Sequence, residues 1–265
     1  EPNAAGGGIS RGRALLYLGG PDGPSATPAQ TFNGEQDAAQ FATALAGAGD
    51  LNGDGYSDIV IGAFGHDIPA LFLTDAGKVY VYYGGPAGPG TAPSWTAVGL
   101  GYGSELGRSV AAAGDIDADG YGDLVAGAPS RLAASLAGAV RVYYGGSSGL
   151  GSGFLTVSSP NANFGSAVTG ADRNGDGFSD VVFSSDLLDS TDDDGRVWTA
   201  FGNHGGSGDT LPRAHRARQV DRLGGPVADE GREPTPGHHA VLADAFRVAG
   251  RGQQVRLLLE TKPLG

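Results

Sequence analysis

The chain has no cysteine and no methionine, and none of its apolar runs is long enough to span a bilayer. Without cysteine it forms no disulfides and offers no thiolate to a soft metal. Its start shows no signal-peptide pattern, and the missing initiator predicts a processed protein or an excerpt of a longer one. The sequence also lacks a nucleophile motif, a glycine-rich phosphate loop and any pairing of histidine with an acid. We therefore expect a protein that is not an enzyme.

Basic residues are scarce in the first part of the chain. Residues 1–202 hold 22 acids against 8 bases, a net charge of -14, whereas residues 203–265 hold 7 against 9, a net charge of +2. This shift predicts a boundary near residue 203. The acidic part is unsuited to nucleic acids and anionic membranes and well suited to cations. A composition rich in arginine, alanine and glycine and poor in lysine indicates a GC-rich genome, and we expect a bacterial protein.

Glycine, at 49 of 265 residues without a collagen-like period, predicts an all-β fold of short strands and tight turns. Four segments repeat one strand pattern that ends in a glycine turn. They are GRALLYLGG from Gly12, GKVYVYYGG from Gly77, GAVRVYYGG from Gly138 and GRVWTAFGN from Gly195. No helix-length amphipathic period appears in residues 1–202.

Each interval between these segments contains a small-residue strand, an acidic loop and a second apolar strand, with room for a fourth strand in variable stretches such as residues 91–98. Four antiparallel strands in about 60 residues predict one blade of a β-propeller. We expect a partial repeat at 1–30 and repeats at about 31–98, 99–158 and 159–202, followed by a linker at 203–222. Residues 223–265 predict a β-hairpin or the start of a β-sandwich-like segment.

The acidic loop occurs three times, as DLNGDGYSD at 50–58, DIDADGYGD at 115–123 and DRNGDGFSD at 172–180. Alternate residues of a curled loop turn inward, so positions 1, 3, 5 and 9 can present oxygens to one point while glycine at position 6 permits the sharp turn. Position 7 can contribute its backbone carbonyl. Hard oxygen ligands without His or Cys favour Ca²⁺. Position 12 is apolar, unlike an EF-hand, and the alternative is a set of Asx turns that satisfy local amides.

The segments resemble the FG-GAP repeats of the integrin α-subunit β-propeller. The Phe-Gly element is Phe164-Gly165, becomes Leu106-Gly107, and departs to Phe41-Ala42. The Gly-Ala-Pro element is intact at Gly127, Ala128 and Pro129, becomes Gly62-Ala63-Phe64 in the first repeat, and is replaced by Ser184-Ser185-Asp186 in the third. The resemblance covers roughly residues 9–202.

The resemblance implies structural calcium ions in loops at one face of the propeller and partner proteins at loops of the opposite face. Carried over by position, the three ligand sets are Asp50, Asn52, Asp54, the Tyr56 carbonyl and Asp58; Asp115, Asp117, Asp119, the Tyr121 carbonyl and Asp123; and Asp172, Asn174, Asp176, the Phe178 carbonyl and Asp180. Integrin-type propellers have seven blades, so these repeats suggest an excerpt of a longer propeller; a small closed form, or an open fragment completed by another chain, are the alternatives.

Four other features have a more ordinary interpretation. His238-His239 lacks partners at ligand spacing and indicates a solvated loop, and Asp192 to Asp194 before Gly195 indicate a hairpin turn rather than a fourth ion site. The arginines of residues 213–222 indicate a solvated linker. Trp198 lies in a strand pattern and is expected to pack, whereas Trp95, in a variable segment, is the better candidate for contacting a partner.

The leading hypothesis is a calcium-stabilised, non-enzymatic, extracellular or cell-surface propeller that mediates adhesion or protein recognition, with a protein or glycan partner and no nucleic acid or membrane insertion. The alternative is an accessory or substrate-binding module of a larger secreted hydrolase or lyase. A structural spacer without a ligand is the third possibility.

Overall fold

The computed structural model describes residues 11–130, 138–159, 163–185, 196–202, 246–247 and 254–255. The chain divides into two compact units, Glu1–Gln219 and Val220–Gly265. The described residues form antiparallel sheets, and the one helix among them is the single 3-10 turn η1, Pro69–Leu71. The predicted all-β class is confirmed.

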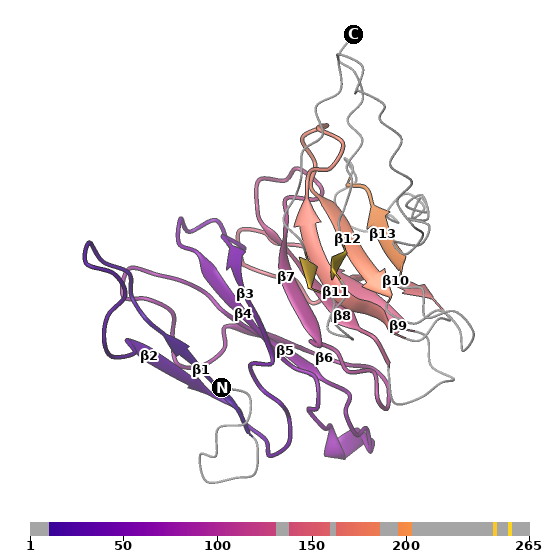
Figure 1. Ribbon diagram of the computed structural model, residues 1–265, viewed down its shortest axis with the longest axis horizontal. Helices are drawn as coiled ribbons and strands as arrows, with labels where there is room; N and C mark the ends of the chain where they lie inside the picture. The colour runs from indigo at the N-terminus through magenta and orange to yellow at the C-terminus, as the bar shows by residue number, and fades with distance from the viewer. Residues whose placement is uncertain are drawn as a thin grey trace, which may run out of the picture. The chain divides into compact units, whose positions relative to one another are not determined.

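The first unit begins with a two-stranded sheet and continues with three larger sheets, which we call blades 1, 2 and 3 (Figure 1). The first sheet pairs β1 (Arg13–Leu16) with β2 (Gln30–Asn33). Blade 1 contains β3 (Ala44–Gly49), β4 (Asp58–Ala63), β5 (Lys78–Tyr82) and β6 (Trp95–Val98); blade 2 contains β7 (Ser109–Gly114), β8 (Asp123–Ala128), β9 (Gly138–Tyr143) and β10 (Leu155–Ser159); blade 3 contains β11 (Phe164–Ala171), β12 (Asp180–Ser185) and β13 (Arg196–Ala200). The predicted fourth strand in residues 91–98 is β6.

Each blade is a meander in which every strand pairs with the next strand along the chain. None of the described sheets closes on itself. The first strands of the blades lie next to one another, since β3 contacts β7 and β7 contacts β11. Successive blades therefore pack face to face in chain order, as in part of a propeller.

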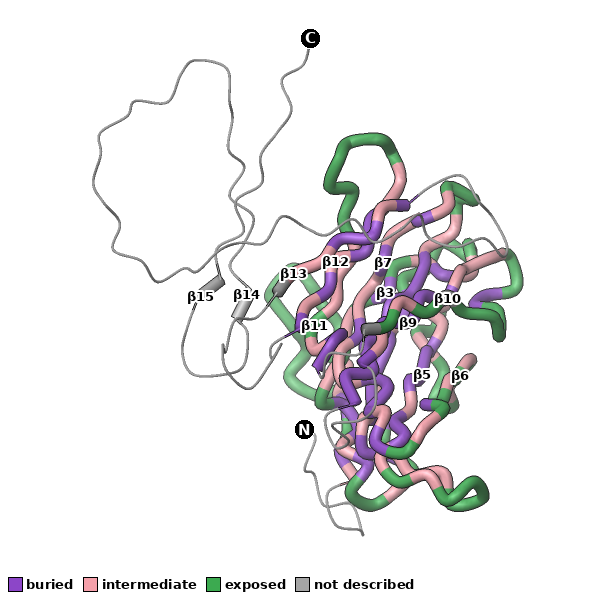
Figure 2. Tube along the Cα trace, turned by 90° about the vertical axis from the view of Figure 1, so that its right-hand side faces the viewer, coloured by how far each residue is buried: buried purple, intermediate pink, exposed green. Residues whose placement is uncertain are grey.

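Alternation along the strands divides each blade between two cores. In β4, Val60 lies in a cluster with residues of blade 2, whereas Ile61 lies in a cluster with Phe32 and Phe41 on the side of the first sheet. In β8, Val125 packs towards blade 3. Figure 2 shows that buried residues follow the strands and that exposed residues lie mainly in the connecting loops. Period-2 alternation with both faces covered explains the small and β-branched strand residues.

In the second unit, β14 (Phe246–Arg247) pairs with β15 (Gln254–Val255) in antiparallel register. The division into residues 1–202, 203–222 and 223–265 remains a prediction. The proposed turn at Asp192 to Asp194, the arginines of the linker and His238-His239 lie outside the described residues.

Candidate metal centres

The three acidic loops occupy the same place in each blade, between the first and the second strand. Glycine at position 6 has a left-handed backbone in all three, with φ of 86° at Gly55, 93° at Gly120 and 89° at Gly177. L-residues rarely adopt this conformation, which confirms the predicted reason for glycine there. Position 4 is left-handed as well, even where it is Ala118, with φ of 56°.

The carboxylate at position 1 accepts backbone amides from across its own loop. Asp50 accepts the amide of Gly53 at 2.7 Å and that of Gly55 at 2.8 Å. Asp115 accepts the amide of Gly120 at 3.0 Å, and Asp172 makes the corresponding contact. These bonds curl each loop around its first residue, as in the Asx turns considered above.

The carboxylate at position 9 is buried and joins two distant backbone segments. Asp123 is fully buried and accepts the amide of Ile116, at position 2 of its loop, at 2.7 Å. Its other oxygen accepts the amide of Gly145, which follows the third strand of the blade, at 2.9 Å. Asp58 and Asp180 make the same pair of contacts in blades 1 and 3. This aspartate therefore fixes the loop to its blade.

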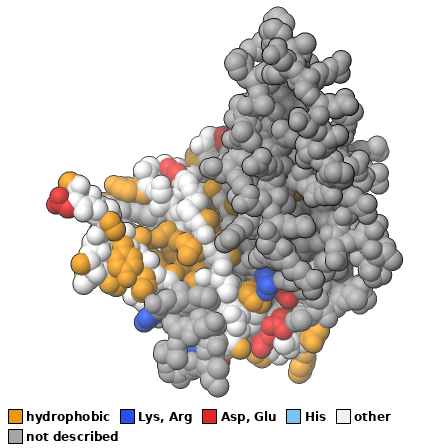
Figure 3. Space-filling model, in the orientation of Figure 1, with side chains coloured by type: hydrophobic (Ala, Val, Ile, Leu, Met, Phe, Trp, Pro, Cys, Tyr) orange, Lys and Arg blue, Asp and Glu red, His pale blue; other side chains and the backbone are white. Residues whose placement is uncertain are grey.

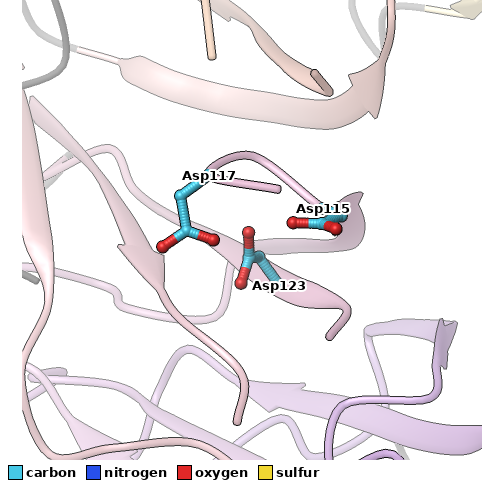
Figure 4. Close-up of side chains that lie close together, drawn as sticks. All are labelled: Asp115, Asp117 and Asp123. Carbon is cyan, nitrogen blue, oxygen red and sulfur yellow. The ribbon is translucent and has the colours of Figure 1, made fainter. Parts of the chain in front are cut away.

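Loop 2 gathers three carboxylates. Ligand oxygens of Asp115, Asp117 and Asp123 all lie within 4.8 Å of one another, and Figure 4 shows their carboxylates turned towards one another. The Oδ1 atom of Asp117 is buried and has no hydrogen-bond partner. Burial raises the pKa of Asp123 to about 7, against the opposing effect of its two amide bonds. The pKa of Asp117 is also raised, first by burial and then by the charge of Asp119.

Loops 1 and 3 differ at position 3, where asparagine replaces Asp117. Asn52 donates its side-chain amide to Asp54 at 3.0 Å, and Asn174 donates to Asp176 at 2.7 Å. Within the described residues, loop 2 alone brings three acidic side chains together. Burial nevertheless raises the pKa of Asp58 and of Asp180, and neighbouring loop aspartates raise it further.

The donor set of loop 2 fits a hard divalent cation. A buried carboxylate oxygen without a partner and raised carboxyl pKa values indicate negative charge that nearby amides compensate only in part. Oxygen ligands without nitrogen or sulfur select Ca²⁺ or Mg²⁺ over transition metals. One acidic cluster of the chain can therefore hold a metal ion.

The structure corrects the interpretation of one tryptophan. Trp95 is not an exposed anchor, because its ring packs edge-on against Tyr143 of blade 2, with ring centres 4.8 Å apart, and its Nε1 donates to the carbonyl of Gly151. An edge strand such as β6 gives no local sign of which neighbouring side chain will cover it. Trp198 packs beside Phe164, as expected.

Sequence reasoning missed the partners of the buried aspartates, Gly84, Gly145 and Gly202. The available signal was the glycine that ends each third-strand segment. A Cβ atom at Gly145 would lie 2.1 Å from the carbonyl oxygen of Gly122, so only glycine fits there. No helix among the described residues is long and apolar enough to cross a membrane.

Repeated antiparallel blades, each with an acidic loop between its first two strands, define a β-propeller-like repeat domain. The family model "FG-GAP repeat" matches residues 41–82 and 106–144. The chain therefore contains FG-GAP repeats in two places, which coincide with blades 1 and 2. Blade 3, where Ser184 and Ser185 replace Gly-Ala, lies outside these matches.

Similar curated proteins fall into two groups. The chain is 34% identical over 173 residues to phosphatidylinositol-glycan-specific phospholipase D of Rattus norvegicus, covering 58% of this chain and 20% of that protein. It is 38% identical over 120 residues to integrin alpha-IIb of Mus musculus, covering 44% and 11%, and 34% identical over 122 residues to integrin alpha-5 of Xenopus laevis, covering 44% and 11%. The matched region is thus a fifth or less of each relative.

Proposed function

We propose that this chain is a calcium-stabilised, non-catalytic propeller segment that acts in recognition or adhesion outside the cell. The observation that carries the proposal is the convergence of Asp115, Asp117 and Asp123 in loop 2, with one buried oxygen of Asp117 left without a partner. A bound Ca²⁺ supplies the positive charge that offsets repulsion among the carboxylates. The loops then hold their blades together and perform no chemistry.

The proposed ligands are the residues at positions 1, 3, 5 and 9 of each loop, with the carbonyl at position 7. Loop 2 is the strongest site because its four side chains are all aspartates, whereas loops 1 and 3 each have an asparagine at position 3. More anionic ligands raise Ca²⁺ affinity. In each loop the buried aspartate at position 9 would serve both as a ligand and as the acceptor that ties the loop to its blade.

Thermal melting in EGTA and in millimolar Ca²⁺ tests this proposal. At about 1 mM Ca²⁺ and a Kd of about 0.1 mM, each site would stabilise the fold by roughly 1.4 kcal/mol, and three independent sites by about 4 kcal/mol. The melting temperature should rise by several degrees with Ca²⁺. Equal concentrations of Mg²⁺ provide the control for divalent charge alone. If the melting curves in EGTA and Ca²⁺ coincide, the metal proposal is wrong.

The surface opposite the metal loops supports recognition of a partner. The acidic loop precedes β4 and residues 64–77 follow it, so the two lie at opposite ends of that strand. Phe72 is 92% exposed with a left-handed φ of 56°, and Leu71 and Tyr102 are more than half exposed. Tyr102 lies in the loop between β6 and β7. The amide of Gly103 in this loop donates to the carbonyl of Thr74, so the loop is joined to residues 64–77.

Figure 3 shows hydrophobic side chains beside acidic ones at the lower edge of this view, where Figure 1 draws η1. A large aromatic side chain held in an unfavourable backbone conformation at a loop tip is typical of a binding surface. We infer that this loop surface contacts a protein or glycan partner.

The second candidate is an accessory domain beside a catalytic domain, and the similarity to a phospholipase D favours it. Arrays of glycans and of extracellular proteins, probed with and without Ca²⁺, separate the two. Calcium-dependent binding of proteins that Phe72→Ala abolishes supports recognition of a protein. Binding of lipid-linked glycans instead supports the accessory role.

A further inference from the structure

Neighbouring acidic loops are joined directly by backbone hydrogen bonds. The amide of Gly122, at position 8 of loop 2, donates to the carbonyl of Asp50, at position 1 of loop 1, at 3.0 Å. The amide of Ser179, at position 8 of loop 3, donates to the carbonyl of Asp115, at position 1 of loop 2, at 2.9 Å. The same two positions are connected at both junctions between blades.

Each of these bonds belongs to a longer path between two proposed ligands. The amide of Gly122 shares its peptide unit with the carbonyl of Tyr121, the proposed ligand at position 7 of loop 2. The carbonyl of Asp50 shares its peptide unit with the amide of Leu51, which donates to Oδ2 of Asp58 at 2.8 Å. Two peptide units thus connect a ligand of loop 2 to a ligand of loop 1.

The path recurs between loops 3 and 2. Phe178 and Ser179 supply the first peptide unit, and Asp115 and Ile116 supply the second. The amide of Ile116 ends the path on Oδ2 of Asp123 at 2.7 Å. We propose that this relay couples the three metal loops, so that a cation in one loop raises the affinity of the adjacent loop for a second cation. The inference rests on the proposed calcium function.

Polarisation and ordering both act along the relay. A carbonyl of Tyr121 that serves as a ligand makes its peptide N–H a stronger donor, and hydrogen bonds in a chain polarise one another. A stronger donor at Leu51 strengthens its hydrogen bond to Oδ2 of Asp58 and holds that carboxylate in place for a cation. Fixing the peptide of Gly122 also fixes the carbonyl of Asp50, so part of the ordering cost of loop 1 is met before its own cation binds.

Side-chain packing adds to the coupling between loops 1 and 2. The ring of Tyr121 covers Gly53, where a Cβ atom would lie 2.5 Å from the ring Cε1. The amide of Gly146 donates to the carbonyl of Leu51 at 3.2 Å. Repulsion between the two cations opposes the effect, but it is screened at physiological salt and acts between solvent-facing loops. Loops 1 and 3 share no such hydrogen bond among the described residues.

Site-resolved titration of the whole chain with Ca²⁺ tests the relay. Gly55, Gly120 and Gly177 each donate an amide to the position 1 carboxylate of their own loop, so their NMR amide shifts report the three sites separately. The variants Asp54→Asn, Asp119→Asn and Asp176→Asn remove one charge from one loop and keep an acceptor oxygen. All three residues are exposed. Asp22→Asn, at an exposed aspartate outside the loops, is the control for net charge.

We expect Asp119→Asn to weaken the sites of loops 1 and 3 by roughly fivefold or more, a typical size for coupling between sites. Because coupling is reciprocal, Asp54→Asn and Asp176→Asn should each weaken the site of loop 2 and leave each other's loop nearly unchanged. If one variant fails to fold, the other two still test a junction each.

Unchanged affinities at adjacent loops would overturn the relay and leave the calcium sites standing. Equal weakening of adjacent and distant loops, or weakening by Asp22→Asn, would also overturn it, because a general effect of stability or charge would then explain the data. If no glycine amide shifts with Ca²⁺ in the unmodified chain, the proposed function itself fails.

Discussion

The contacts between neighbouring blades differ from the outer sides of blade 1 and blade 3 in the glycines of two motif elements. A Cβ atom at Gly62 would lie 2.0 Å from the carbonyl oxygen of Gly107, and one at Gly127 would lie 1.9 Å from that of Gly165. At the outer sides these glycines are absent. Ser184 takes the place of Gly62 and Gly127, since all three pair with a valine of the next strand.

The first blade shows the matching change in the other element of the motif. Ala42 stands where Gly107 and Gly165 stand in blades 2 and 3, and it keeps their left-handed backbone, with φ of 65°. The amide of Ala42 donates to the carbonyl of Gly62 in its own blade, as the amide of Gly107 donates to the carbonyl of Gly127. The glycines of the two motif elements are therefore needed where the backbones of two blades meet, and an L-residue is tolerated elsewhere.

The largest expected effect comes from filling such a contact. Gly127→Ala places a methyl group against the backbone of Gly165, which cannot move without shifting β11. We expect a loss of about 3 kcal/mol or more in the free energy of unfolding, at the upper end of overpacking effects. Urea unfolding in millimolar Ca²⁺ measures it.

Ser184→Gly is the matched control on the outer side of blade 3. It relieves no close contact between described blades and weakens a strand position, so the expected loss is within about 1 kcal/mol. Equal losses in Gly127→Ala and Ser184→Gly would show that the blade contact does not determine the need for glycine.

The second largest expected effect is a pH dependence of the free energy of unfolding that arises in blade 2, the central blade. The pKa of Asp123 is raised from 3.8 to about 7 by burial, so the folded metal-free protein holds this proton more tightly than the unfolded chain. The resulting stability is complete below pH 3.8 and is lost as the pH rises through 7. In EGTA, Asp123 should remove roughly 2 to 3 kcal/mol between pH 5 and pH 7.5.

Comparison with Asp123→Asn isolates this contribution. The pKa of His66 is lowered from 6.5, mainly by burial. His66 therefore makes the folded protein more stable as the pH rises towards 6.5, which is opposite to the effect of Asp123. Both proteins retain His66, so the difference between their pH slopes in EGTA belongs to Asp123. If the variant loses as much stability as the parent between pH 5 and pH 7.5, the buried carboxyl is not the cause. Ca²⁺ should reduce the slope of the parent.

The local sequence predicted what local geometry determines. Alternation gave the strands, and the need for a positive φ explained glycine at position 6 of the loops. The local sequence could not predict contacts between residues that are far apart along the chain and meet only in the folded protein. Asp58 meets Gly84, 26 residues away, and Trp95 meets Tyr143 of the next blade. Nothing in the pattern around Trp95 distinguishes a covered edge strand from an exposed one.

The smallest expected effect is that of Ala42→Gly, the substitution that restores the motif in blade 1. Removing an L-residue from a left-handed conformation gains about 1 to 2 kcal/mol. The loss of a buried methyl costs about 0.8 kcal/mol, and the freer unfolded chain costs about 0.4 to 1 kcal/mol. These effects nearly cancel, so stability in urea should change by less than about 1 kcal/mol. A gain in stability well above about 1 kcal/mol would show that Ala42 is strained, as an alanine at position 107 would be. Glycine would then be favoured on the outer side of blade 1 as well, and the contrast between inner and outer contacts would not hold there.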